Sequence, residues 1–523
     1  MFQLSRLRAI SLSSMALLTV ISFALVNYVR QAPAPVDQLG VVHFKVSCTA
    51  VAQKEFNIAM AYYHSFGTTL IGPVLDRALQ ADPSCGMAHW ARALSILDNP
   101  FGWPIIPAKA MTEGTAALEA ARKTGLKSQR ERDYVEALAL LFVDHDKQAF
   151  RARAKAFESA LELVAKRYPD DTEATVLHAL VVSANFDPAD KTFANQLRAA
   201  RILEPIFQRQ PNHPGVAHYL IHSYDYPPLA KYGLDAARKY AKIAPAAPHA
   251  LHMPSHIFTL LGLWREAIAS NRAAAAAATE WTHQGHHARE YMTYALLQLG
   301  EIDDARQVMK QQRAMSVFDH FGTAYPYASI PARIAIESDA WKEASELPLY
   351  AAETYPWKKY PQAEAVNAFA RGIGSAMSGN PTGAYAEVKR LTELREATRG
   401  LKLNYWVDQV DIQADIVRGL AMFAEGKHDE GIAALRKAAD REDATAKHVV
   451  TPGAVVPARE LLATILSRHG KPVEALAEFE KVLEREPNRR RALSGAAQNA
   501  ERAGDKGRAA RYAEAVRAGG MKE

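Results

Sequence analysis

The amino-acid sequence predicts an all-α protein: an α-solenoid of stacked helix-turn-helix repeats, preceded by one hydrophobic N-terminal helix. Three observations lead to this prediction. The composition is 49% hydrophobic but only 9% aromatic, with abundant alanine, which favours helices that pack closely. A glycine recurs five residues before a small residue, as where one helix ends and the next begins. At 523 residues the chain is also longer than one hydrophobic core usually covers, so it contains several domains or an array of repeats.

The charge pattern argues against a nucleic-acid partner. The chain has 63 basic and 57 acidic residues, which gives a formal net charge of +6. The two signs are interspersed along the chain, whereas nucleic-acid binding would need a basic patch or stripe.

The N-terminus predicts a membrane segment. Arg6 and Arg8 precede an apolar run from Ala9 to Val26, close to the length of roughly 20 residues that spans a bilayer. The basic end would stay inside, so we expect a membrane anchor with the rest of the chain outside the cytoplasm, in the periplasm if the source is bacterial. The alternative is a secreted protein, cut after the small residues at 32–34, although Pro35 would impede that cleavage.

The sequence contains two cysteines, Cys48 and Cys85. In an oxidising compartment they could form one disulfide, or both could remain buried free thiols. Neither lies in a CxxC motif, so nothing indicates redox catalysis.

The C-terminal segment "VPARELLATILSRHGKPVEALAEFEKVLEREPN" shows the repeat most clearly. Counted from Val456, Gly470, Ala475, Phe479 and Pro487 fall at positions 15, 20, 24 and 32. This spacing resembles the tetratricopeptide repeat (TPR), a 34-residue helix-turn-helix unit. Small residues stand where the two helices touch, glycine where the first helix ends, and proline where the second must stop.

Weaker copies of the unit cover most of the chain, at Gly262, Gly300, Gly379 and Gly426, for about nine or ten degenerate units. The pattern divides the chain into the N-terminal membrane or signal segment 1–31, a linker 32–51, N-terminal TPR-like repeats with a proline- and aromatic-rich insertion 52–126, irregular helical repeats 127–213, histidine-rich TPR-like repeats 214–315, degenerate TPR-like repeats 316–455, and a C-terminal repeat with capping helices 456–523.

Histidines gather in the middle of this array, where nine of the 18 lie between His213 and His287. We set three consecutive 34-residue units to begin at Pro214, Pro248 and Thr282. Equivalent positions are then occupied by His218, His252 and His286 (position 5), by His222, His256 and Glu290 (position 9), and by Gly215, His249 and His283 (position 2). Positions 2, 5 and 9 share one face of a helix, so stacked repeats place these stripes side by side. The resemblance to the TPR family implies that this face lines a concave groove.

Imidazoles paired four residues apart on a helix are suited to binding a divalent transition metal such as zinc, iron or copper. The candidate metal ligands are His218, His222, His252, His256, His286 and Glu290, and the candidate groove-lining residues are Asp225, Tyr226, His249 and His283. Two histidines with Glu290 would suit non-haem iron or catalytic zinc. The alternatives are a metal-free groove for an anionic or peptide ligand, and duplicated histidines that only hydrogen-bond a neighbouring helix.

Pro254 complicates this arrangement, because it falls at position 7 of its unit, inside the expected first helix. The helix could instead begin at Pro254, with the preceding "PHALHM" as an extended loop that carries His249 and His252.

The runs "HYLIHSYDYP" and "HALHMPSHIF", with the earlier "VHFKVSC" and "HSF", are similar to a group of exported bacterial TPR proteins of unsettled function. This resemblance implies an exported solenoid and assigns no reaction or catalytic residue. We therefore expect an exported, membrane-anchored TPR solenoid that binds a protein, peptide or small ligand in its concave groove, with or without a histidine-bound metal. The alternative is a metal-dependent hydrolase or non-haem oxygenase that uses the same His/Glu cluster.

Overall fold

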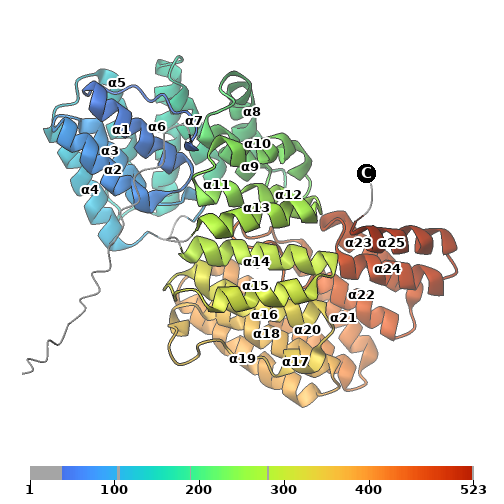
Figure 1. Ribbon diagram of the computed structural model, residues 1–523. Coiled ribbons are helices and arrows are strands. Elements are labelled where there is room, and N and C mark those ends of the chain that lie inside the picture. Colours follow the sequence, from blue (N-terminus) through green and yellow to red (C-terminus); the bar gives the residue numbers. More distant parts are fainter. Residues whose placement is uncertain (1–37, 103–105, 189, 279–281, 521–523) are drawn as a thin grey trace, which may run out of the picture. The chain divides into compact units, whose positions relative to one another are not determined.

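Helices make up all the regular structure of the computed structural model, which describes residues 38–102, 106–188, 190–278 and 282–520 (Figure 1). The all-α prediction is therefore confirmed for this part of the chain. The predicted N-terminal helix and cleavage site, within residues 1–35, lie outside the described residues. Among the residues that the structure describes, no helix is both long enough and apolar enough to cross a membrane.

The N-terminal helices pack as neighbouring antiparallel pairs, from α1 against α2 to α7 against α8. Their bounds are α1 (Ala50–His64), α2 (Thr68–Ala81), α3 (Gly86–Ile96), α4 (Ala108–Lys123), α5 (Gln129–Ala139), α6 (Phe150–Arg167), α7 (Thr172–Ala184) and α8 (Ala194–Arg209), with a 3-10 turn at Pro100–Gly102. A disulfide joins Cys48, two residues before α1, to Cys85, the residue before α3, with their Cα atoms 5.1 Å apart. It ties the starts of two successive helix pairs together.

The middle repeats follow the predicted register. Their bounds are α9 (Pro214–Tyr224), α10 (Leu234–Ile243), α11 (Pro248–His252), α12 (Pro254–Leu260), α13 (Trp264–Ala277), α14 (Thr282–Leu299) and α15 (Ile302–Arg313), with a 3-10 turn at Ala230–Gly233. The first helices α9, α11 and α14 begin at the three expected residues, 34 apart. Proline is the first helical residue of α9, α11 and α12, where its missing N–H costs nothing.

The second unit of this set has a divided first helix, as Pro254 requires. α11 ends at His252 and α12 begins at Pro254, with Met253 between them still in helical conformation. The expectation of an extended loop before Pro254 is therefore wrong: His249 and His252 lie on a short helix, because Pro248 starts a helical turn of its own.

The predicted turn glycines lie where first helices end. Gly262, Gly300, Gly379, Gly426 and Gly470 have φ angles of +67°, +77°, +77°, +87° and +78°. Glycine adopts this left-handed conformation at little cost, which ends one helix and turns the chain into the next. A Cβ on Gly262 would also come within 2.3 Å of the carbonyl oxygen of Pro487, so the C-terminal part approaches the middle repeats closely here.

The C-terminal helices complete the array. Their bounds are α16 (Phe321–Glu337), α17 (Trp341–Ser345), α18 (Pro361–Met377), α19 (Pro381–Gly400), α20 (Asn404–Ala424), α21 (His428–Asp443), α22 (Ala458–Arg468), α23 (Pro472–Arg485), α24 (Arg490–Arg502) and α25 (Lys506–Ala518), with a 3-10 turn at Trp357–Lys359. α24 contacts α14, and the indole N–H of Trp264 donates to the carbonyl of Asn488 at 3.0 Å. Buried Arg489 pairs with Glu337 and Glu460, each at 2.6 Å.

The segment 444–457, between α21 and α22, is held against the middle of the molecule. The buried guanidinium of Arg333 on α16 donates to the carbonyls of Gly453 at 2.8 Å and Ala454 at 2.7 Å. Lys447 of the same segment reaches Asp225, directly after α9, at 3.1 Å. Residues far apart in sequence therefore meet at the histidine-rich repeats.

Candidate functional site

The histidine-rich repeats bring six imidazoles together from four helices. α9 carries His218 and His222, α11 carries His249 and His252, α12 carries His256, and α14 carries His287. They form two groups: a first trio of His218, His222 and His249, and a second trio of His252, His256 and His287. In each trio, one ring nitrogen per residue lies within 4.8 Å of the other two. We call these six residues the six-histidine centre.

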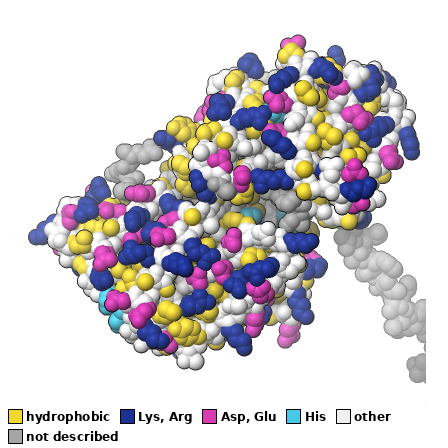
Figure 2. Space-filling model, turned by 180° about the vertical axis from the view of Figure 1, so that it is seen from behind, with side chains coloured by type: hydrophobic (Ala, Val, Ile, Leu, Met, Phe, Trp, Pro, Cys, Tyr) yellow, Lys and Arg dark blue, Asp and Glu magenta, His cyan; other side chains and the backbone are white. Residues whose placement is uncertain are grey.

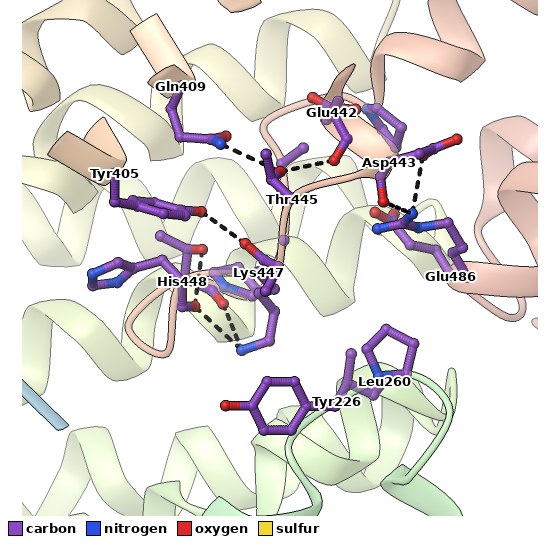
Figure 3. Close-up of a pocket in the computed structure, with 18 of the residues that line it drawn as sticks. Tyr226, Leu260, Tyr405, Gln409, Glu442, Asp443, Thr445, Lys447, His448 and Glu486 are labelled. Atoms are coloured by element: carbon purple, nitrogen blue, oxygen red, sulfur yellow. Dashed lines mark hydrogen bonds and ion pairs between the residues drawn. The ribbon is translucent and has the colours of Figure 1, made fainter. Parts of the chain in front are cut away.

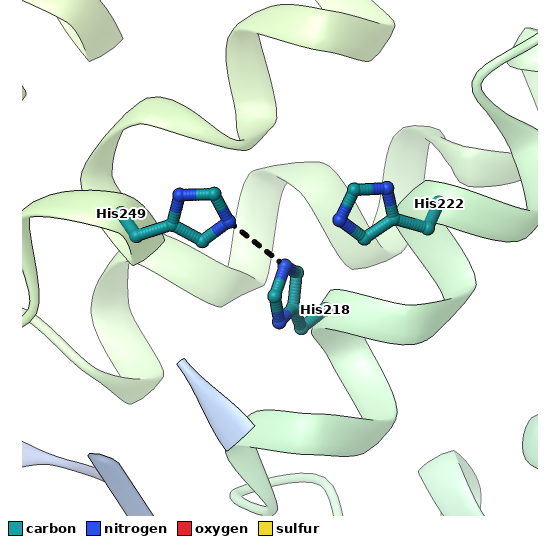
Figure 4. Close-up of side chains that lie close together, drawn as sticks. All are labelled: His218, His222 and His249. Atoms are coloured by element: carbon teal, nitrogen blue, oxygen red, sulfur yellow. Dashed lines mark hydrogen bonds between the residues drawn. The ribbon is translucent and has the colours of Figure 1, made fainter. Parts of the chain in front are cut away.

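The rings of the first trio converge on one space (Figure 4). The Nε2 atoms of His218 and His249 are 3.1 Å apart, and His218 Nδ1 donates to the carbonyl oxygen of His64 at 2.7 Å. Both ring nitrogens of His222 are buried and have no hydrogen-bond partner among the described residues. Phe101 stacks on the His222 ring, with centroids 4.0 Å apart, and shields it from solvent. A buried imidazole with no partner is costly unless something else binds it.

In the second trio, neighbouring side chains fix the ring orientations. His252 Nδ1 lies 2.7 Å from Asn271 Oδ1, and His256 Nδ1 lies 2.9 Å from Asp225 Oδ2. The Nε2 atoms of these two histidines face each other at 3.0 Å. The ring of His287 lies against that of His252, with centroids 4.4 Å apart. Histidine ligands of metals are commonly held in this way, with the second ring nitrogen donating to a carboxylate or carbonyl oxygen.

Burial keeps these imidazoles neutral. His218 is fully buried, and His222, His252 and His256 expose no more than 5% of their surface, while His249 and His287 are partly buried. Desolvation lowers the pKa of His252 to about 4 and holds the pKa values of the other five well below the usual 6.5. Neutral imidazole is the form that binds transition metals. On the face shown in Figure 2, histidine occupies small areas, and basic and acidic side chains are interspersed.

A further pair of buried histidines, His64 and His213, differs from the six-histidine centre because all its ring nitrogens are hydrogen-bonded. Glu173 accepts from His64 Nε2 at 2.9 Å and from His213 Nε2 at 3.0 Å. The other nitrogens accept hydrogen bonds, His64 Nδ1 from the Tyr219 hydroxyl at 2.9 Å and His213 Nδ1 from the backbone N–H of Val216 at 3.3 Å. Every ring nitrogen of this Glu173 cluster has one partner with a matching role. The cluster is complete without a ligand.

Two of the candidate ligands lie outside both trios. His286 packs on Tyr327 and directs Nε2 toward the carbonyl of Ser316 at 3.4 Å. Glu290 lies 3.8 Å from the guanidinium of Arg333 and 4.0 Å from His287 Nδ1, and burial raises its pKa to about 7. Consecutive residues of a helix point about 100° apart, so only one of His286 and His287 can face the rings of α11 and α12.

Two of the four candidate groove residues lie at the six-histidine centre, and the other two lie outside it. His249 joins the first trio, and Asp225 orients His256. The ring of His283 instead packs on Phe318 and His320. The hydroxyl of Tyr226 accepts from Gln196 at 3.0 Å, and its ring lines a neighbouring cavity. The predicted histidine wall is thus largely buried, and none of the six histidines lines this cavity.

The cavity has a volume of about 310 Å³ and lies between Tyr226 and the segment 444–457 (Figure 3). Its wall includes Tyr405, Trp406 and Lys447, and the Lys447 side chain continues from this wall to Asp225. Glu442 also lines it, and burial raises the pKa of this carboxyl to about 8. The cavity is therefore separated from the second trio by the Lys447–Asp225 pair.

Sequence reasoning did not single out His287, Asn271 or Lys447 as members of the site. For His287 a signal was present, since it adjoins the candidate His286, but the divided helix at Pro254 makes the facing position hard to assign. Asn271 lies on α13, on the second helix of the repeat, where no histidine pattern points to it. Lys447 is 222 residues from Asp225, so no local pattern links them.

The comparisons with known proteins found only distant matches. No family model matches the chain, and no curated protein matches it either. Among solved structures, one chain of the Naa15/Naa10 structure bound to HypK-THB is 14% identical with a TM-score of 0.24; the match covers 89% of this chain and 63% of that one, less than two thirds of its length. The crystal structure of the P58(IPK) TPR domain is also 14% identical, with a TM-score of 0.22 and coverage of 87% and 99%. At such scores the TPR-like description of this chain rests on its own helix pairs and their 34-residue register.

Proposed function

We propose that the six-histidine centre binds a divalent transition metal, so that this chain is a metal-binding helical-repeat protein. The observation that carries the proposal is the contact between His252 and His256, whose Nε2 atoms face each other at 3.0 Å.

The positions of the protons make this contact unfavourable without a cation. The Asn271 side chain donates through Nδ2 to the carbonyl of Ala267, so its Oδ1 accepts from His252 Nδ1. Asp225 Oδ2 accepts from the Lys447 ammonium, so it also accepts from His256 Nδ1. Both Nδ1 atoms therefore carry the ring proton, and both Nε2 atoms present lone pairs. A second proton on either ring is opposed by burial, which lowers both pKa values.

The ligand set favours zinc or copper. Each trio offers three neutral imidazoles, a set common for both metals, and leaves a coordination position open. Iron in the two-histidine, one-carboxylate arrangement would need Glu290 among the ligands. That carboxyl lies 4.0 Å from His287 Nδ1 but also 3.8 Å from the Arg333 guanidinium, whose positive charge opposes a cation there.

Elemental analysis tests the proposal. The full chain, purified without chelators or a histidine tag, should contain zinc or copper in stoichiometric amount or take it up when it is added. The double variant His222→Ala, His256→Ala should lose this metal, whereas the matched double variant His283→Ala, His286→Ala, on histidines outside both trios, should keep it. A wild-type chain that neither contains nor takes up metal would overturn the proposal.

A metal-dependent enzyme is the second candidate, because three protein ligands with one open position are typical of catalytic rather than structural zinc. Hydrolysis of ester or phosphoester substrates, or oxidation by copper and oxygen, would have to depend on the same histidines. A screen of the metal-loaded chain against the His222→Ala, His256→Ala variant tests this, and equal activity in both would rule it out for this centre.

We also propose that the chain is exported and held at a membrane by its N-terminal segment. The Cys48–Cys85 disulfide supports export, since such bonds persist in oxidising compartments. Unreduced peptides should contain the linked pair, and the protein should stay with membranes after a carbonate wash. Two freely alkylated thiols would contradict export, and release of a shortened chain would indicate cleavage of a signal peptide.

A further inference from the structure

The two histidine trios lie next to each other. Adjacent rings inside a trio have centroids 4.4–5.0 Å apart, and the spacing between the trios is only slightly wider. The ring centroids of His222 and His256, from different trios, are 6.3 Å apart, and those of His249 and His252, also from different trios, are 6.2 Å apart. Within the second trio, the centroids of His256 and His287 are likewise 6.3 Å apart. By distance, the six rings form one continuous array.

The trios also share their supports. The five-residue helix α11 carries His249 of the first trio and His252 of the second, one turn apart. Asp225 directly follows α9, which holds two members of the first trio, and it orients His256 of the second. A displacement of α9 or α11 would therefore disturb both sets of ligands together.

We propose that the two trios bind two metal ions as one dinuclear centre, in which the ions are close enough to interact magnetically. This inference rests on the proposed function and adds the number of ions and their coupling. Metal–imidazole bonds of about 2 Å place an ion roughly 3 Å from each ring centroid, so the two ions would lie within about 12 Å of each other.

Asp225 supplies a carboxylate suited to such a pair. Its Oδ2 accepts from His256 and Lys447, while its Oδ1 is buried and has no hydrogen-bond partner among the described residues. It lies one helical turn after His222. Two divalent cations surrounded by neutral imidazoles need negative charge nearby, and Asp225 provides it at the point where the trios meet.

Copper(II) titration of the full chain, followed by electron paramagnetic resonance (EPR), tests the proposal. We expect two copper ions per chain, with dipolar broadening and a half-field signal that appear as the second equivalent binds. The double variants His222→Gln, His249→Gln and His252→Gln, His287→Gln should each bind one copper with the narrow spectrum of an isolated ion. The matched variant His283→Gln, His286→Gln should behave as the wild type.

The outcomes separate this inference from the proposed function. Two copper ions whose spectrum is the sum of the two single-trio spectra would overturn the dinuclear centre and leave the metal-binding function standing. One copper per chain that requires histidines from both trios would also overturn it, in favour of a single mixed site. Absence of copper binding would overturn both. Because the coupling is measured in the wild-type titration, the test holds even if a variant fails to fold.

Discussion

The six-histidine centre and the Glu173 cluster are both built from buried histidines of neighbouring helices, yet only one of them is internally complete. Around Glu173, each ring nitrogen of His64 and His213 meets a partner of the opposite role at 2.9–3.3 Å. In the six-histidine centre, the nitrogens of His222 lack partners and two lone pairs face each other at 3.0 Å. Clustering of histidines alone therefore does not distinguish a structural cluster from a metal site; the direction of each hydrogen bond does.

The largest expected difference between the two clusters is their response to metal. Zinc that binds only the folded chain should raise the free energy of unfolding by about 4 kcal/mol for each filled trio at one thousand times Kd. Thermal melts with added zinc and then with chelator measure this. The shift should disappear in His222→Ala, His256→Ala and persist in His213→Gln, and the opposite pattern would assign the metal to the Glu173 cluster.

Removal of the Glu173 carboxylate, which His64 and His213 share, should affect the stability of the chain and not its metal binding. In Glu173→Ala, the Nε2–H groups of His64 and His213 lose their acceptor in a site less than 2% exposed. Each unsatisfied buried donor costs about 1–3 kcal/mol, so the free energy of unfolding should fall by about 2–6 kcal/mol. Metal stoichiometry should stay unchanged. Denaturant unfolding and elemental analysis of the same sample check both statements, with Glu173→Gln as the milder matched change. A loss of metal without a loss of stability would contradict the structural role.

Acid should destabilise the metal-free chain through His252. Burial lowers its pKa to about 4 in the folded state, against an ordinary value of 6.5, so between these pH values the unfolded chain binds more protons. The contribution of His252 to the free energy of unfolding is then fully present above about pH 6.5. It is lost, by on the order of 3 kcal/mol, as the pH drops to about 4. Unfolding midpoints across this range should show a shallower slope for His252→Gln, whose amide keeps a contact with Asn271. Identical slopes would mean that His252 does not titrate in this window.

The sequence predicted more of the fold than of the site, for identifiable reasons. The starts of α9, α11 and α14 follow from a local 34-residue period, and the turn glycines have the expected positive φ. His218, His222, His252 and His256 meet because that period stacks equivalent positions. The contact between Lys447 and Asp225 depends instead on how the segment 444–457 crosses to the middle repeats, which no local period encodes. Binding of a protein or peptide partner remains a prediction, and the wall expected to receive it is buried.

The smallest expected effect concerns the residue that most clearly separates the two clusters. Asp225 fixes the proton on His256 Nδ1, as Glu173 fixes those on His64 and His213, but it leaves the opposite nitrogen free for a ligand. In Asp225→Asn this orientation weakens, and metal affinity should fall about 10–100-fold, or about 1.4–2.7 kcal/mol, with the stoichiometry retained. Competition with a chromophoric chelator measures the change, and Asp235→Asn, on the exposed surface of α10, is the matched control. Equal affinities in the two variants would mean that Asp225 serves only to bind Lys447, and that the ring of His256 is oriented by the stacked Tyr291 instead.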